Sequence, residues 1–136
     1  MIRTLDEISD NTIVPKKQNS KLASFAPKIN ILDCQIDWTL SALKIHNKIR
    51  AFSPYPGAFT YYKNKRIKLF GSKISNNNFA EILQPGHINY NKPFLQIGTG
   101  SKEIIIVNNI QIEGKKRLPA TQYILGHPEI IGEKFE

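Results

Sequence analysis

Cysteine and long apolar runs are scarce in this 136-residue sequence. The single cysteine, Cys34, excludes an internal disulfide, and with no second thiol or histidine at ligand spacing it fits a reducing compartment. We interpret Cys34 as a small packing residue. No apolar run approaches the ~20 residues that span a bilayer, and the N-terminus lacks the features of a signal peptide. The sequence therefore predicts a cytoplasmic, single-domain-sized protein without a membrane partner.

Acidic residues are nearly missing from the middle of the chain. The whole sequence carries 19 Lys and Arg against 11 Asp and Glu, a net charge of +8. Between Trp38 and Lys102, ten cations face Glu81 alone, a net of +9. The ten are Lys44, Lys48, Arg50, Lys63, Lys65, Arg66, Lys68, Lys73, Lys92 and Lys102. Such an excess concerns partners and solubility, and it makes polyanions the first candidate partners.

Patterns typical of catalysts are also missing. His46, His87 and His127 are far apart and form no metal-ligand spacing, so we predict no metal site. The stretch GTGSK at 98–102 lacks the spacing and the following helix of a phosphate-binding P-loop. No motif indicates an activated nucleophile or a paired acid and base.

The N-terminal segment has an apolar stripe without an obvious partner. Ile2, Leu5 and Ile8 fall on one face of a short helix, which we expect Pro15 to stop. A helix of about ten residues is not stable alone in water, so the stripe either docks on this domain or belongs to a longer protein. Residues 16–30 are polar, contain Pro27 and show no period, and they are predicted to form an extended linker.

One clear helix precedes a strand-rich remainder. Trp38, Ala42, Ile45 and Ile49 recur at helical spacing; we expect Asp37 or Thr39 to cap the helix and Pro54 to prevent its continuation past Phe52 or Ser53. Strands are predicted in 58–62, 66–70, 87–90, 94–97 and 103–112, with an irregular excursion over 72–86 and a last short helix over 119–126.

The first two strands form a hairpin with unequal faces. They flank the loop Lys63–Lys65, in which Asn64 tolerates a left-handed backbone. In the second strand Ile67 and Leu69 alternate with Arg66 and Lys68, so one face is apolar and the other cationic. The fold class is mainly β with one or two helices, as a small Greek-key barrel of the oligonucleotide-binding type; a sandwich is the alternative.

Cations and aromatic residues are interleaved in the hairpin region. Tyr55, Phe59, Tyr61 and Tyr62 lie among the lysines and arginines, a pattern typical of surfaces that bind a nucleic-acid backbone. The alternative is that the aromatic residues belong to the core and that the lysines only solubilise the hairpin.

Three strings resemble the C-terminal domain of methionyl-tRNA formyltransferases. They are SFAPKI at 24–29, IDWTLSALKIHNKIRAFSPYPGAF at 36–59 and QIEGKKRLPATQYILGHPEIIGEKF at 111–135. The resemblance also covers the opening residues, and it implies three segments: 1–14 as the last helix of a catalytic domain, 15–32 as a linker, and 33–136 as the barrel domain. The orphan stripe would then contact that catalytic domain.

The resemblance implies a role in holding initiator Met-tRNA. In this family an N-terminal domain with Asn, His and Asp residues and a Ser-Leu-Leu-Pro loop transfers formyl from 10-formyltetrahydrofolate; none of these elements occurs here, so the chain alone should bind no cofactor and be inactive. Phosphate contacts carry over by motif to Lys28, Arg50 and the run Lys115, Lys116 and Arg117. Arg50 could instead clamp the carbonyls of the following bend. The cations of the helix end and hairpin join the set: Lys48, Lys63, Lys65, Arg66 and Lys68.

Two other functions remain open. Variants of the same module occur in sugar N-formyltransferases, where this domain would be an accessory element without a nucleic-acid partner. A free-standing module that grips a protein through Ile2, Leu5 and Ile8 is the third reading. The +9 middle segment and the late GKKR favour the tRNA-binding reading, with the chain as a monomer.

Overall fold

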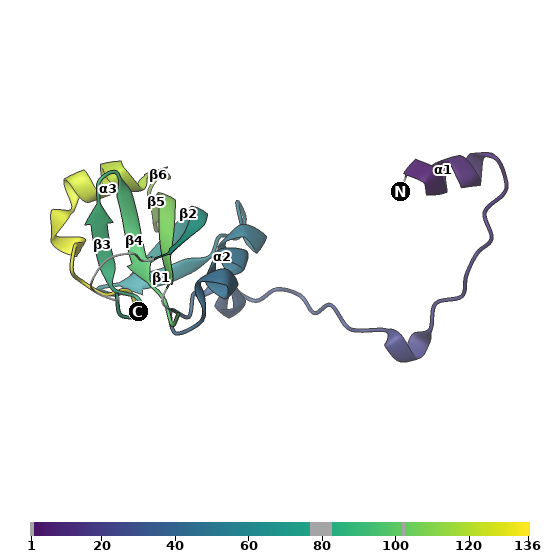
Figure 1. Cartoon of the computed structure of the whole chain (residues 1–136), viewed down its shortest axis with the longest axis horizontal. Coiled ribbons are helices and arrows are strands. Elements are labelled where there is room, and N and C mark those ends of the chain that lie inside the picture. Colours follow the sequence, from purple (N-terminus) through teal and green to yellow (C-terminus); the bar gives the residue numbers. More distant parts are fainter. Residues whose placement is uncertain (1, 77–82, 102) are drawn as a thin grey trace.

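The computed structural model describes residues 2–76, 83–101 and 103–136. Three α-helices, three short 3-10 helices and six strands follow one another along this part of the chain (Figure 1). Their order is α1 (Ile2–Ser9), η1 (Ser20–Leu22), η2 (Ile31–Cys34), α2 (Ala42–Ala51), β1 (Phe59–Tyr62), β2 (Lys65–Asn76), β3 (Ile88–Asn91), β4 (Phe94–Gly98), β5 (Glu103–Ile112), β6 (Leu118–Pro119), α3 (Ala120–Gly126) and η3 (Pro128–Ile130).

All strands belong to one antiparallel sheet. The strand order is β1-β2-β5-β4-β3, with β6 paired to β5, so the hairpins β1–β2 and β3–β4–β5 meet where β2 pairs with β5. The mainly β fold class is confirmed. The outermost strands β1 and β3 do not pair with each other in the described part of the chain, so strand pairing does not close the sheet into a barrel there.

The C-terminal strap, residues 132–136, spans the open side of the sheet. The Gly132 amide donates to the Ile88 carbonyl at 2.9 Å, and the Ile88 amide donates to the Glu133 carbonyl at 2.9 Å. At the other edge, the Glu136 amide donates to the Tyr61 carbonyl at 2.9 Å. The strap therefore contacts both β3 and β1, and it satisfies edge groups that would otherwise be free to pair with another chain.

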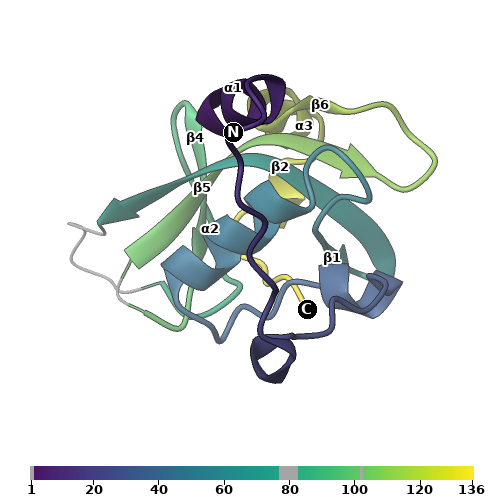
Figure 2. The ribbon, with the colours of Figure 1, turned by 90° about the vertical axis from the view of Figure 1, so that its right-hand side faces the viewer.

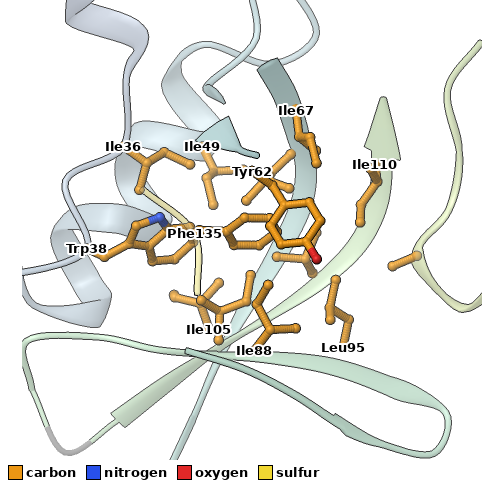
Figure 3. Close-up of a cluster of buried hydrophobic side chains, with 14 of the residues drawn as sticks. Ile36, Trp38, Ile49, Tyr62, Ile67, Ile88, Leu95, Ile105, Ile110 and Phe135 are labelled. Atoms are coloured by element: carbon orange, nitrogen blue, oxygen red, sulfur yellow. The ribbon is translucent and has the colours of Figure 1, made fainter. Parts of the chain in front are cut away.

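Aromatic side chains join the strap to the core. Phe135 is buried; its ring stacks on Trp38 with centroids 5.9 Å apart and meets Tyr62 edge-on at 6.3 Å (Figure 3). The Trp38 indole N–H donates to the Thr60 hydroxyl at 2.9 Å, and that hydroxyl donates to the Glu136 carbonyl at 2.7 Å. A buried indole N–H thus has the partner it requires.

Helix α2 covers one side of the sheet, across β2 and β5 (Figure 2). Its apolar stripe, Ala42, Ile45 and Ile49, is buried as predicted, and its end at Ala51 agrees with the limit set by Pro54. The predicted start was wrong, because Trp38 precedes the helix.

The first turn of α2 is capped from a distant loop. Asp37 does not cap the helix as predicted. Its carboxylate accepts the Thr39 amide and hydroxyl at 2.9 and 2.6 Å, and these bonds hold the pKa of Asp37 below its ordinary value. The Ala42 amide donates to the hydroxyl of Ser101 at 3.2 Å. Ser101 therefore satisfies a free amide in the first turn of α2, which is the role of an N-cap side chain.

The β1–β2 hairpin has the predicted turn. Lys63 and Asn64 adopt φ values of 48° and 63°, the pair of left-handed residues that a two-residue hairpin loop requires. Ile67 and Leu69 are buried, and Arg66 and Lys68 lie on the opposite face.

The predicted irregular excursion over 72–86 was wrong at its start. Strand β2 continues to Asn76 because Ser72–Asn76 pair with 103–107 of β5. Residues 77–82 lie outside the described part of the chain. The strands 88–91, 94–98 and 103–112 and the helix 120–126 agree with the predicted order.

Helix α1 stands apart from the sheet domain. It ends at Ser9 rather than at Pro15, none of its residues is buried, and only η1 interrupts the extended chain that follows it (Figure 1). The structure therefore does not show the stripe docking on this domain. None of the helices described here is long and apolar enough to cross a membrane.

We predict that Gly100→Ala destabilises the fold. A Cβ at this position would overlap the carbonyl oxygen of Thr39. The Gly100 amide is held close to this segment because it donates to the Leu40 carbonyl at 2.9 Å. We expect a loss of about 1–3 kcal/mol in unfolding free energy, measured by urea denaturation followed by circular dichroism. Gly126→Ala is the control, because a Cβ there meets open space. Equal stability of the two variants would contradict this account of the loop.

Candidate nucleic-acid interface

Three adjoining depressions run along one face of the sheet domain. The first, of about 570 Å³, is lined by Lys28–Ile31, Tyr55 and Pro56. The second, of about 230 Å³, shares Tyr55 and Pro56 with it and reaches Arg66 and Lys68. The third, of about 90 Å³, lies between Arg66, Lys68 and Glu113. Because neighbouring depressions share lining residues, they form one surface, which we call the basic groove.

Strand register places the groove's cations side by side. Phe59 of β1 pairs with Lys68 of β2, and Lys68 pairs in turn with Gln111 of β5. Since side chains alternate along a strand, Arg66 and Lys68 share the face opposite Ile67. Of the described residues that line the three depressions, Glu113 is the one with a carboxylate.

Two of the predicted phosphate-binding lysines hold the backbone in place. The Lys68 ammonium donates to the Pro56 carbonyl at 2.7 Å, and the Lys48 ammonium donates to the Gln35 carbonyl at 2.8 Å. Both side chains are half-buried. The alternative role of Arg50 as the clamp of the bend was wrong, because Lys68 makes that contact and the Arg50 side chain is exposed with no hydrogen bond to the described residues.

Arg66 is held by an ion pair and a ring. Its guanidinium bonds the Glu113 carboxylate and lies 5.5 Å from the centre of the Phe59 ring. Its Nε–H is buried and has no partner among the described residues. The pairing neutralises the groove's one carboxylate and leaves Lys28 and Lys68 as the unneutralised charges of its lining.

Arg117 lies beside the groove, and Lys115 and Lys116 precede it in the same loop. The guanidinium of Arg117 stacks 4.1 Å from the centre of the buried Phe70 ring, and Phe70 in turn is close to Gly57 of the bend. Lys115 and Lys116 are exposed in the loop between β5 and β6. This loop is oriented by the Gln111 amide, which donates to the Lys115 carbonyl at 2.9 Å.

The β1–β2 hairpin adds an exposed lysine that forms no ion pair with the residues described by the structure. Lys65 is exposed, while Lys63 lies 3.7 Å from Glu133 of the C-terminal strap and 5.0 Å from the centre of the Tyr62 ring. Both residues of that ion pair are exposed, so water screens it and the pair leaves Lys63 accessible to an anion.

Of the four aromatic residues singled out in the sequence, Tyr55 alone is fully exposed. Its exposed fraction is 86%, whereas Phe59 and Tyr62 are buried and Tyr61 is half-buried. The reading of these residues as core is thus confirmed for Phe59 and Tyr62. Tyr55 remains as a side chain that a ligand can reach.

The side chains of Cys34 and His46 contact other parts of the fold. Cys34 is buried at the floor of the groove, and burial raises the pKa of its thiol, so it is a poor nucleophile. His46 bonds Ser72 at 2.8 Å, and its partial burial lowers its pKa. The described residues contain no group of three or more potential metal ligands.

The structure thus divides the ten predicted residues into three groups. Lys28, Arg66 and Lys68 line the groove, and Arg117 lies beside it. Lys63, Lys115 and Lys116 extend from neighbouring turns and Lys65 begins β2, whereas Lys48 and Arg50 belong to α2. Glu113 was missed by sequence reasoning. Its position one residue after a predicted strand and before GKKR was the available signal.

Comparison with known families gives a consistent result. The profile of the family described as "Formyl transferase, C-terminal domain" matches residues 28–128. Methionyl-tRNA formyltransferase of Staphylococcus epidermidis is 41% identical over 130 residues, which are 95% of this chain and 41% of that protein. The same enzyme of Clostridium perfringens is 33% identical over 98% of this chain and 42% of its own length. The chain spans about two fifths of the length of the curated relatives it matches.

Solved structures share the fold at lower identity. HypX from Aquifex aeolicus, in complex with tetrahydrofolic acid, has a TM-score of 0.66 and 18% identity, covering 90% of this chain and 22% of that one. A multiply substituted variant of HypX gives a TM-score of 0.69 with 98% of this chain covered. At this identity, the likeness establishes a common fold only.

We predict that Lys68→Met destabilises the domain and Lys65→Met does not. The first substitution leaves the Pro56 carbonyl without its charged donor, and we expect a loss of about 1–2 kcal/mol. The second removes an exposed charge of the same strand, with an expected effect within about 0.5 kcal/mol. Urea denaturation measures both. Equal midpoints would show that the Lys68 contact contributes nothing to stability.

Proposed function

The chain belongs to the formyl transferase C-terminal domain family and is the C-terminal domain of a methionyl-tRNA formyltransferase. From this premise, we propose that it holds the initiator tRNA substrate of that enzyme. The observation that carries the proposal is the basic groove with the exposed cations around it. Lysine and arginine side chains bind phosphates of any sequence, so the domain positions tRNA rather than reading its bases.

The charge distribution supports a phosphate-binding role over the alternatives. A nucleotide-sugar substrate requires no broad cationic face, whereas a tRNA backbone presents many phosphates. Lys28, Lys65, Lys115, Lys116 and Arg117 are all exposed, and their side chains form no ion pair within the described residues. They can therefore exchange mobile counterions for phosphates when tRNA binds.

The chemistry belongs to another part of the enzyme in this proposal. Cys34 is buried and its pKa is raised, and the described histidines have structural partners or lie apart. We assign the 10-formyltetrahydrofolate site and formyl transfer to the portion of the relatives that this chain does not span. Residues 1–136 alone are then inactive, and binding and catalysis lie on separate domains.

Helix α1 provides the contact to that catalytic portion. Ile2, Leu5 and Ile8 have exposed fractions of 79%, 60% and 53%, although they form one apolar face. We propose that 1–14 packs on the catalytic domain as its last helix, that 15–32 is the linker, and that 33–136 is the tRNA-holding domain. The apolar face then gains a partner to bury against.

The triple variant Lys65→Ser, Lys115→Ser, Lys116→Ser should weaken tRNA binding. Each lost phosphate contact lowers the steepness of the salt dependence, so we expect the slope of log affinity against log salt to fall by about 2–3. Filter binding at about 50 and 200 mM salt measures this. Initiator and elongator tRNA should lose affinity equally, since phosphates carry no sequence information.

A charge-matched control separates location from net charge. Lys44, Lys73 and Lys92 are exposed lysines outside the proposed interface, and their replacement by Ser removes the same charge. We expect this control to keep most of the slope. An equal loss in both triple variants would contradict the assigned interface, and no retention of tRNA at low salt by the unaltered chain would overturn the proposed function.

A chimera tests the assignment to the enzyme. Residues 1–136 replace the matching segment of the Staphylococcus epidermidis relative, and we expect the chimera to formylate Met-tRNA. Replacing Ile2, Leu5 and Ile8 together by Ser should lower its activity, because the apolar contact to the catalytic portion is lost. Leu22→Ser, an exposed apolar change in the proposed linker, is the control. A folded but inactive chimera would contradict the proposal.

A further inference from the structure

The first depression of the basic groove contains an aromatic ring that the fold does not use. Tyr55 lines it together with Lys28, Ile29, Ile31 and Pro56. Its volume of about 570 Å³ is in the range of sites that hold a small molecule, roughly 300–1,000 Å³. Most of the tyrosine side chain is exposed, so removing the ring costs the core nothing.

The backbone around Tyr55 is fixed on both sides. The Gly57 amide donates to the Phe52 carbonyl at 2.8 Å, which closes the bend. The carbonyl of Pro56, the residue after Tyr55, accepts the Lys68 ammonium at 2.7 Å. A ring presented from a braced bend loses little freedom on binding, which favours a flat ligand that stacks on it.

Charge around the depression indicates what kind of flat ligand fits. Lys28 lines the same depression, and Lys68 and Arg66 line the next one. The carboxylate of Glu113 is already paired with Arg66. The surroundings are thus cationic beside an apolar, aromatic surface. An apolar peptide would leave the cations unused, whereas a nucleotide supplies both a π-face and a phosphate.

We propose that the depression binds one unpaired nucleotide of the RNA, with its base stacked on Tyr55 and its phosphate beside Lys28. This inference rests on the proposed tRNA-holding function and adds a site that distinguishes single-stranded from paired RNA. A paired base inside a duplex is stacked between its neighbours and cannot reach the ring. Stacking tolerates any base, so the site selects RNA structure rather than sequence.

The test compares Tyr55→Ala and Tyr55→Phe in the full chain. Binding is measured with a short single-stranded RNA and with a blunt RNA duplex of equal charge. We expect Tyr55→Ala to weaken single-strand binding about five- to hundredfold and to leave duplex binding unchanged. Tyr55→Phe should stay within about twofold, because the ring remains. A 2-aminopurine in the single strand should be quenched by the unaltered chain and not by Tyr55→Ala.

Controls keep this inference separate from the proposed function. Phe94→Ala removes another exposed aromatic side chain outside the groove and should change neither affinity. Equal effects of Tyr55→Ala on single-stranded and duplex RNA, including no effect on either, would overturn the stacking site and leave phosphate binding in place. A loss with Tyr55→Phe as large as with Tyr55→Ala would also overturn it. No binding of either RNA by the unaltered chain would overturn both proposals.

Discussion

The insertion of Phe135 between Trp38 and Tyr62 is the contact on which the domain depends. It brings the strap across the open side of the sheet and ties together three segments that are remote in sequence. The relay from the Trp38 indole through the Thr60 hydroxyl to the Glu136 carbonyl satisfies the polar groups that this burial encloses. Without the strap, β1 and β3 would each have an edge free to pair with another chain.

The cations of this domain divide into those that form contacts within the fold and those that remain exposed. Lys48 and Lys68 use their charge on backbone carbonyls, and Arg66 uses its charge on Glu113. The exposed lysines lie next to this braced region, with Lys65 at the start of β2 and Lys115 and Lys116 in the loop between β5 and β6. A surface of this kind combines fixed shape with mobile charge: the braced residues hold the bend in position, and the free ones respond to an approaching polyanion.

Sequence periodicity was sufficient for most elements and insufficient where long-range contacts decide. The alternation of Ile67 and Leu69 with Arg66 and Lys68 predicted the hairpin and both of its faces. The start of α2 was missed because its cap, Ser101, is 59 residues away, and the length of β2 was missed because pairing with β5 extends it. For the candidate site, residue type predicted cationic character. Which lysine clamps the bend depends on register, and a motif does not contain register.

The extended chain between α1 and the sheet domain sets how the two proposed parts of the enzyme work together. Residues 10–27, which precede the residues that line the groove, contain only the short helix η1. About twenty residues reach up to roughly 65 Å when fully extended. Such a tether gives the groove a high effective concentration near whatever α1 packs on, without fixing its angle. In this proposal the sheet domain binds and releases a bulky substrate while α1 stays packed on the catalytic portion.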